Sequence, residues 1–137
     1  MRPHALIEGS RSATLRQWWS VTTTLIAVAI LIEAVFAGAM LSGVEWARAA
    51  HAANAVILLA STSAASLVAI VTLRRIPHGT KLGLTLLSLA AVVFLQTAAG
   101  KLSAEGANLM WAHVPLGAAL VGFAGLAAAR ARRLGGQ

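Results

Sequence analysis

The sequence predicts an all-α integral membrane protein, a bundle of four antiparallel transmembrane helices. First, 58% of the 137 residues are hydrophobic and only 11% are charged, with a mean hydropathy of +0.79, which is outside the soluble globular class. Second, polar residues divide the chain into four apolar stretches, each close to the roughly 20 residues that span a bilayer. Third, the basic residues gather on one side of such a bundle. We expect a single domain over residues 1–137.

Each stretch must be helical, because lipid cannot satisfy the polar groups of an open backbone. The first stretch begins at Trp18 and the second at His51. The third follows the turn that contains Pro77, and the fourth ends before Arg130. The predicted spans are approximately 18–41, 51–73, 82–100 and 109–129.

The net charge of +7 raises the question of a nucleic-acid partner, but its distribution argues against one. Nine of the eleven basic residues flank the inner ends of the spans, and only Arg48 and Lys101 lie on the other side. This is the positive-inside pattern, which predicts a multi-pass protein of the plasma membrane with both termini in the cytoplasm. The inner group comprises Arg2, Arg11, Arg16, Arg74, Arg75, Lys81, Arg130, Arg132 and Arg133.

An internal repeat is indicated by two glycine–histidine pairs. Gly38 precedes His51 by the same 13 residues that separate Gly100 from His113. Each half holds two spans, so the halves share one orientation and are related by an axis along the membrane normal. Such a two-fold repeat of two helices puts spans two and four in equivalent positions, facing one another across the bundle.

Ionisable groups inside a membrane are costly and mark functional sites. Two imidazoles at one depth predict one haem b between spans two and four near the outer face, with His51 and His113 as iron ligands. Cysteine is absent, so thiolate sites and iron–sulfur clusters are excluded. The cofactor would lie against small residues, and outer cations would pair with its propionates. The predicted cofactor-binding residues are Arg48, Lys101, Gly38, Gly100, Ala55 and Gly117.

Other interpretations of these polar residues remain open. Each histidine could be a residue of the membrane interface without special function, or Glu45 and Glu105 could complete a zinc site. Glu33 inside span one is either a proton or polar site near the haem or a quinone, or a carboxyl that bonds to Gln96 between spans.

The Gly38 to His51 segment and the Gln96, Gly100 and His113 segment resemble one four-span half of the haem A synthase family, over about residues 30–130. The chain is also similar to a group of uncharacterised short four-span membrane proteins. The resemblance implies that His51 and His113 are axial haem ligands. Arg48 stands where that family has its catalytic glutamate, and only one bundle is present, so the resemblance supports haem binding more than enzyme activity.

The sequence therefore predicts a small b-type cytochrome for one-electron transfer, with no catalytic residue assigned. A quinone or a redox partner protein would exchange electrons with it, and the chain could form a homo-oligomer. The alternatives are a non-redox haem carrier, an accessory membrane subunit of a larger complex, and a proton-coupled small-molecule transporter that uses Glu33.

Overall fold

The computed structural model describes the backbone of residues 3–134 and the side chains of residues 13–134. It contains four helices and, within this range, no strand: α1 (Pro3–Leu41), α2 (Ala47–Leu73), α3 (Gly79–Ala104) and α4 (Met110–Ala131). All four are long and apolar enough to cross a membrane. The predicted all-α membrane bundle is confirmed.

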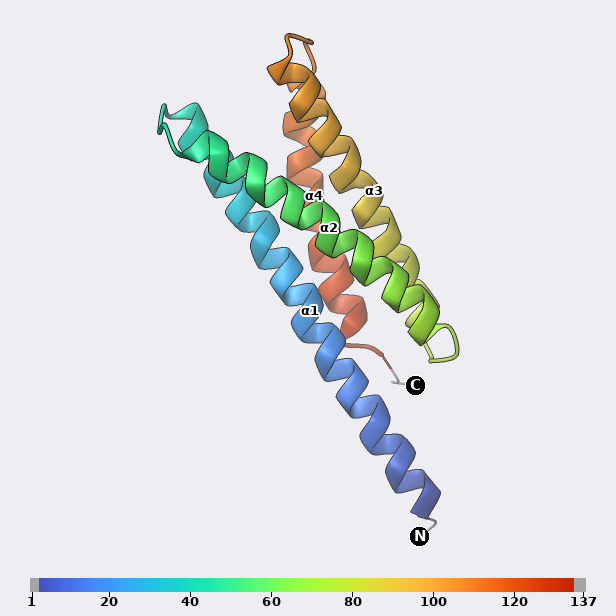
Figure 1. The fold of residues 1–137 in the computed structure, drawn as a ribbon. Helices are drawn as coiled ribbons and strands as arrows, with labels where there is room; N and C mark the ends of the chain where they lie inside the picture. The colour runs from blue at the N-terminus through green and yellow to red at the C-terminus, as the bar shows by residue number, and fades with distance from the viewer. Residues whose placement is uncertain (1–2, 135–137) are drawn as a thin grey trace.

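Every helix reaches beyond the predicted span at one or both ends. The difference is largest in α1, which begins at Pro3 rather than at Trp18, so that its first turns protrude past the other helices (Figure 1). A helix need not stop where its apolar stretch stops, because water satisfies the backbone of further turns. The hydropathy pattern therefore places the spans but not the helix ends.

Both turns at the outer end of the bundle use one kind of helix stop. Gly43 and Gly106 have positive φ angles of 83° and 101°. After α1, the N–H of Val44 donates to the carbonyl of Ala39, and after α3 the N–H of Ala107 donates to the carbonyl of Leu102. A glycine in the left-handed region followed by such a bond is the Schellman stop. Each hairpin is thus closed by a glycine directly beyond the outer helix end.

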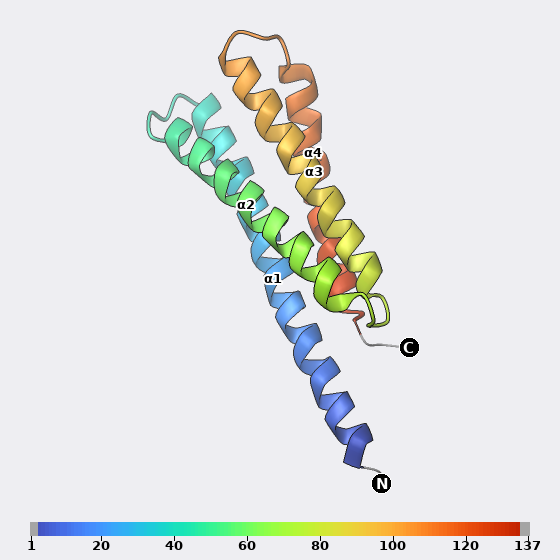
Figure 2. The ribbon, with the colours of Figure 1, turned by 45° about the vertical axis from the view of Figure 1, so that its right-hand side comes forward.

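The helices follow one another around the bundle, so that α1 contacts α2 and α4, and α3 contacts α2 and α4. The backbones of α2 and α4 do not approach each other closely, because these helices lie diagonally across the bundle, as predicted. The two hairpins, α1–α2 and α3–α4, cross and diverge towards the outer turns (Figures 1 and 2). The α2–α3 turn and the basic end of α4 lie at the opposite end (Figure 1). Residues that reach into the space between the hairpins from α2 and α4 can therefore meet.

The core fills only the inner half of the bundle. The buried side chains on the four helices end at Ile30, Leu58, Val93 and Leu120, which lie at about the same level. Beyond that level none of residues 31–46, 48–57 and 94–119 is buried, and Ala47 alone is enclosed. The inner half is therefore held by close packing of Leu, Ala and Thr, whereas the inward faces of the outer half do not close on each other.

The four tryptophans differ in exposure. Trp18, Trp46 and Trp111 are exposed, at 67%, 62% and 73%. Trp19 instead belongs to the core, with 7% exposed, and its carbonyl accepts a hydrogen bond from the Thr23 hydroxyl. Trp18 and Trp19 differ in this way because neighbouring helical residues point about 100° apart.

Replacing Leu86 by alanine is expected to destabilise the bundle by about 2 kcal/mol, at the lower end of the range for buried leucines. Leu86 is fully buried, and its loss leaves a cavity between helices. The transfer contribution is small, because lipid is as apolar as the core. The measurement is unfolding in mixed micelles, with Leu84→Ala, 56% exposed, as the control. Equal losses for both variants would contradict the described core.

Candidate functional site

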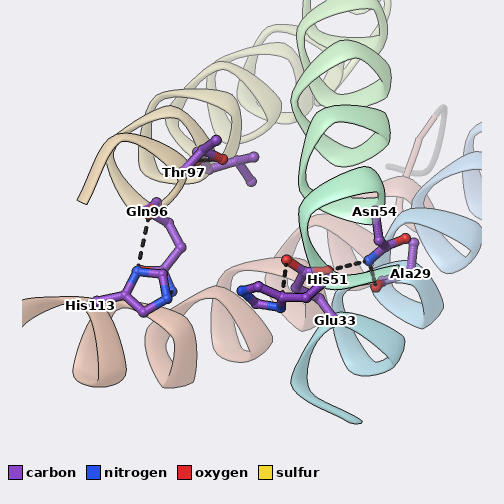
Figure 3. A network of polar contacts seen from close by, with 8 residues as sticks. Ala29, Glu33, His51, Asn54, Gln96, Thr97 and His113 are labelled. Carbon is purple, nitrogen blue, oxygen red and sulfur yellow. Dashed lines mark hydrogen bonds and ion pairs between the residues drawn. The ribbon is translucent and has the colours of Figure 1, made fainter. Parts of the chain in front are cut away.

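The structure brings His51 of α2 and His113 of α4 together in the open outer half of the bundle. Their ring centroids are 6.3 Å apart and the ring planes are inclined at 78°. The His51 side chain points towards the second hairpin, and the His113 ring lies beside Gln96 of α3 (Figure 3). The backbones of α2 and α4 do not approach each other closely, so these two imidazoles meet across the bundle through their side chains.

His51 lies beside a carboxylate that comes from α1. Its Nδ1 is 3.1 Å from Oε1 of Glu33. The contact is close but is not aligned as a hydrogen bond, so it acts mainly through charge. The Nδ2 group of Asn54 donates to Oε2 of Glu33 at 2.7 Å and to the carbonyl of Ala29 at 3.1 Å. Asn54 thereby fixes the carboxylate against α1, with its other oxygen towards His51 (Figure 3).

His113 is held by Gln96 of α3 through both ring nitrogens. Its Nδ1 lies 3.1 Å from the backbone carbonyl of Gln96, and its Nε2 lies 3.3 Å from Nε2 of the Gln96 side chain. A carbonyl can only accept a hydrogen bond, and an amide NH₂ can only donate one. These partners therefore place the proton on Nδ1 and leave the lone pair on Nε2, where the amide currently uses it.

The two histidines thus share one protonation pattern. The Glu33 carboxylate favours a proton on Nδ1 of His51, just as the Gln96 carbonyl does for His113. Metal-bound histidines almost always direct their second N–H to a carboxylate or a backbone carbonyl, which fixes the tautomer and the ring orientation. Nε2 is thus the ring nitrogen left for a ligand, although in His113 it is in contact with the Gln96 amide.

Of the predicted small residues, the two on the second hairpin have clear contacts. A Cβ at Gly100 would lie 2.9 Å from Cε1 of His113, and a Cβ at Gly117 would lie 3.1 Å from Nε2 of Gln96. The absence of side chains at these positions allows His113 to pack on α3. Gly38 is exposed and its missing Cβ would meet nothing within 4 Å. Ala55 is half-buried on α2.

Arg48 and Lys101 lie in helices rather than in the outer loops where they were expected. Arg48 is in the first turn of α2 and Lys101 in the last turn of α3, since both helices extend further than predicted. Both are exposed at the outer end of the bundle. The positive charge of Lys101 interacts favourably with the negative, C-terminal end of the α3 dipole. Arg48 and Lys101 are the two described cations at the outer end of the bundle.

The donor set fits an iron porphyrin in number and spacing. Two imidazoles on opposite sides of one metal, each with a bond of about 2 Å, have ring centres roughly 6 Å apart, which is close to the 6.3 Å observed. Two side-chain atoms on the same stretch of α3, Oε1 of Gln96 and Oγ of Ser103, are buried without a hydrogen-bond partner. Ligation by His113 requires that the Gln96 amide leave its Nε2.

A zinc site fits less well. Across residues 13–134, no three His, Cys, Asp or Glu side chains come close enough together to hold a metal ion. Glu45 and Glu105 are exposed in the outer turns and do not complete a site with the histidines. A shallow hollow lined by Ala119, Gly122, Phe123 and Leu126 lies elsewhere on α4 and contains none of the residues of the site.

Asn54 is the site residue that the sequence prediction missed. It lies three positions after His51, on nearly the same helix face, and it is polar within an apolar span. These two features could have identified Asn54 as a site residue from the sequence. Sequence reasoning also allowed a direct contact between Glu33 and Gln96. The structure instead pairs each residue with the histidine of its own hairpin.

Replacing Gly100 by alanine is expected to displace the His113 ring, because the new methyl group would lie 2.9 Å from Cε1. Haem affinity should fall about tenfold, at the lower end of the range for altered support of a metal ligand. Gly38→Ala is the matched control, since nothing lies within 4 Å of that position. Haem titration of both purified variants checks this, and equal affinities would show that the packing of His113 on Gly100 is unimportant.

Comparisons of the chain with known protein families, with curated proteins and with solved structures found no match. The chain is a multi-pass protein of a lipid bilayer, and the geometry of the site is what indicates its function.

Proposed function

We propose that this protein is a small membrane b-type cytochrome that binds one haem b between α2 and α4 and transfers single electrons. The observation that carries the proposal is the matched presentation of two histidines. Their ring centroids lie 6.3 Å apart, and each Nδ1 faces an acceptor, the Glu33 carboxylate or the Gln96 carbonyl. Such second partners are typical of histidines that bind a metal through Nε2.

The surroundings of the histidines support the same proposal. The helices pack closely only up to Ile30, Leu58, Val93 and Leu120, and each histidine lies seven residues further out on its helix. A flat, apolar macrocycle would give the inward faces of the outer half a surface to pack on. At the outer end, Arg48 and Lys101 supply positive charge for the propionates. When bound, haem supplies a one-electron couple, and ligation by two imidazoles favours electron transfer.

The protein would lie in the plasma membrane with the termini and the α2–α3 turn in the cytoplasm. This orientation follows from the excess of Arg and Lys at the inner end, which the positive-inside rule assigns to the cytoplasmic face. The haem would then lie near the outer leaflet. Its electron partner would be a quinol in the bilayer or a protein at the outer face.

A haem carrier or an accessory subunit would use the same histidines without cycling the iron between two states. A transporter would need Glu33 to exchange protons with a pathway. Glu33 is instead engaged through both oxygens, by Asn54 and by His51. These contacts favour a role for Glu33 in holding His51.

Haem titration of the apoprotein tests the proposal. Purified chain in detergent should bind haem until one equivalent per chain is reached, and the bound haem should accept one electron reversibly. The double variant His51→Ala, His113→Ala should show no saturable binding. Unsaturable binding that is equal in both proteins would indicate partitioning into the micelle and would overturn the proposal.

A further inference from the structure

The two proposed ligands differ in how they are held, although they share a tautomer. The Glu33 carboxylate lies beside Nδ1 of His51, and Asn54 fixes that carboxylate to α1. The Nε2 atom of His51 has no hydrogen-bond partner among the side chains of residues 13–134. The Nδ1 side of His51 is therefore positioned by Glu33, and its Nε2 is free. This arrangement suits a ligand that stays bound.

His113 has a competitor for the same lone pair. Nε2 of the Gln96 side chain lies 3.3 Å from Nε2 of His113, while the Gln96 backbone carbonyl lies 3.1 Å from Nδ1. The ring packs on Gly100, where a Cβ would be only 2.9 Å away, and the amide packs on Gly117 at 3.1 Å. The position of His113 against α3 is thus supported by two hydrogen bonds and by two glycines that leave room for it.

We propose that Gln96 makes His113 the exchangeable member of the histidine pair, so that the site also takes a small neutral diatomic ligand. This inference rests on the proposed haem site. If its Nε2 were released by Gln96, His113 would hold the haem together with His51. While His113 stays on Gln96, bound haem would supply a place for the added ligand. The buried Oε1 of Gln96 has no hydrogen-bond partner in the structure. The amide can therefore turn without breaking a hydrogen bond at that oxygen.

Gln96 is therefore a positioning residue that acts through His113. Removal of its amide should favour ligation by His113 and make the site less accessible to an added ligand. A single neutral hydrogen bond changes such an equilibrium about three- to tenfold. No side chain competes for Nε2 of His51 in the way that Gln96 competes for Nε2 of His113. We therefore expect only His113 to be displaced by an added ligand.

Carbon monoxide is the probe, added to the dithionite-reduced, haem-loaded full chain. The wild type should show a shifted Soret band that saturates, and Gln96→Leu should need about three- to tenfold more carbon monoxide for half-saturation. Gln96→Met, an apolar side chain of similar length, should behave like Gln96→Leu if the leucine variant folds poorly. Thr97→Val is the control, because the Thr97 hydroxyl bonds only to Val93 of its own helix.

The possible failures are distinguishable. A wild type that binds haem but shows no spectral change in saturating carbon monoxide would overturn the inference and leave the cytochrome proposal intact. So would Gln96→Leu and Gln96→Met variants that bind the gas as tightly as the wild type. A chain that binds no haem would show no Soret band at all, and both proposals would be wrong.

Discussion

His51→Ala is expected to lower haem affinity more than any other single change, by at least about 100-fold. This is the upper limit of the loss seen when a residue that only supports a metal ligand is replaced. His51 is the histidine whose Nε2 is free and whose Nδ1 faces the Glu33 carboxylate, so no other described side chain replaces it. His113→Ala should retain more haem but lose the low-spin spectrum, because one imidazole remains. Haem titration and the visible spectrum of each purified variant measure these effects.

The control for these variants is His78→Asn. His78 is exposed in the α2–α3 turn with a φ angle of 63°, a conformation that asparagine tolerates. This variant should bind haem as the wild type does. Retention of full affinity in His51→Ala, or loss of affinity in His78→Asn, would place the ligands elsewhere in the chain.

Glu33→Gln is expected to have the second largest effect. The carboxylate lies 3.1 Å from Nδ1 of His51 and is positioned by Asn54. Loss of such an outer-shell partner costs about 10–100-fold in metal affinity. In the proposed haem site the negative charge would stabilise the ferric state over the ferrous state, so its removal should raise the midpoint potential, by about 59 mV for each tenfold change in that preference. Spectroelectrochemical titration of both proteins gives the potential.

Asn54→Leu should also raise the midpoint potential, but by a smaller amount. The charge of Glu33 remains in this variant, whereas the hydrogen bond from Asn54 that positions it is lost. Glu45→Gln is the matched control, because Glu45 is an exposed glutamate of the outer turn. An unchanged potential in Glu33→Gln would mean that the carboxylate has no influence on the bound iron and would reopen its role as a separate proton site.

Most of the fold could be predicted from composition, since four apolar stretches in a bilayer leave little choice of architecture. The diagonal arrangement of α2 and α4 was predicted from the two-fold repeat of two spans. The helix ends could not be predicted in the same way. Hydropathy reports where lipid begins, whereas helix ends depend on local stops such as Gly43 and Gly106. This is why Arg48 and Lys101 proved to lie within helices. The internal repeat itself stays a prediction.

The candidate site was predictable to the level of its two histidines, because their spacing from Gly38 and Gly100 is a one-dimensional signal. Their partners were not predictable to the same degree. Whether Glu33 faces Gln96 or His51 depends on the rotation of α1 against α2, and no sequence period reports that angle in helices with apolar residues on all sides. The contact between Gly100 and His113 likewise depends on how closely α3 and α4 approach.

A dithionite-reduced minus oxidised visible spectrum of the detergent-purified protein tests the central claim most directly. The account predicts sharp α and β bands of a low-spin haem, present in the wild type and absent from the double variant His51→Ala, His113→Ala. A protein that stays colourless after expression with added haem precursor would contradict the account.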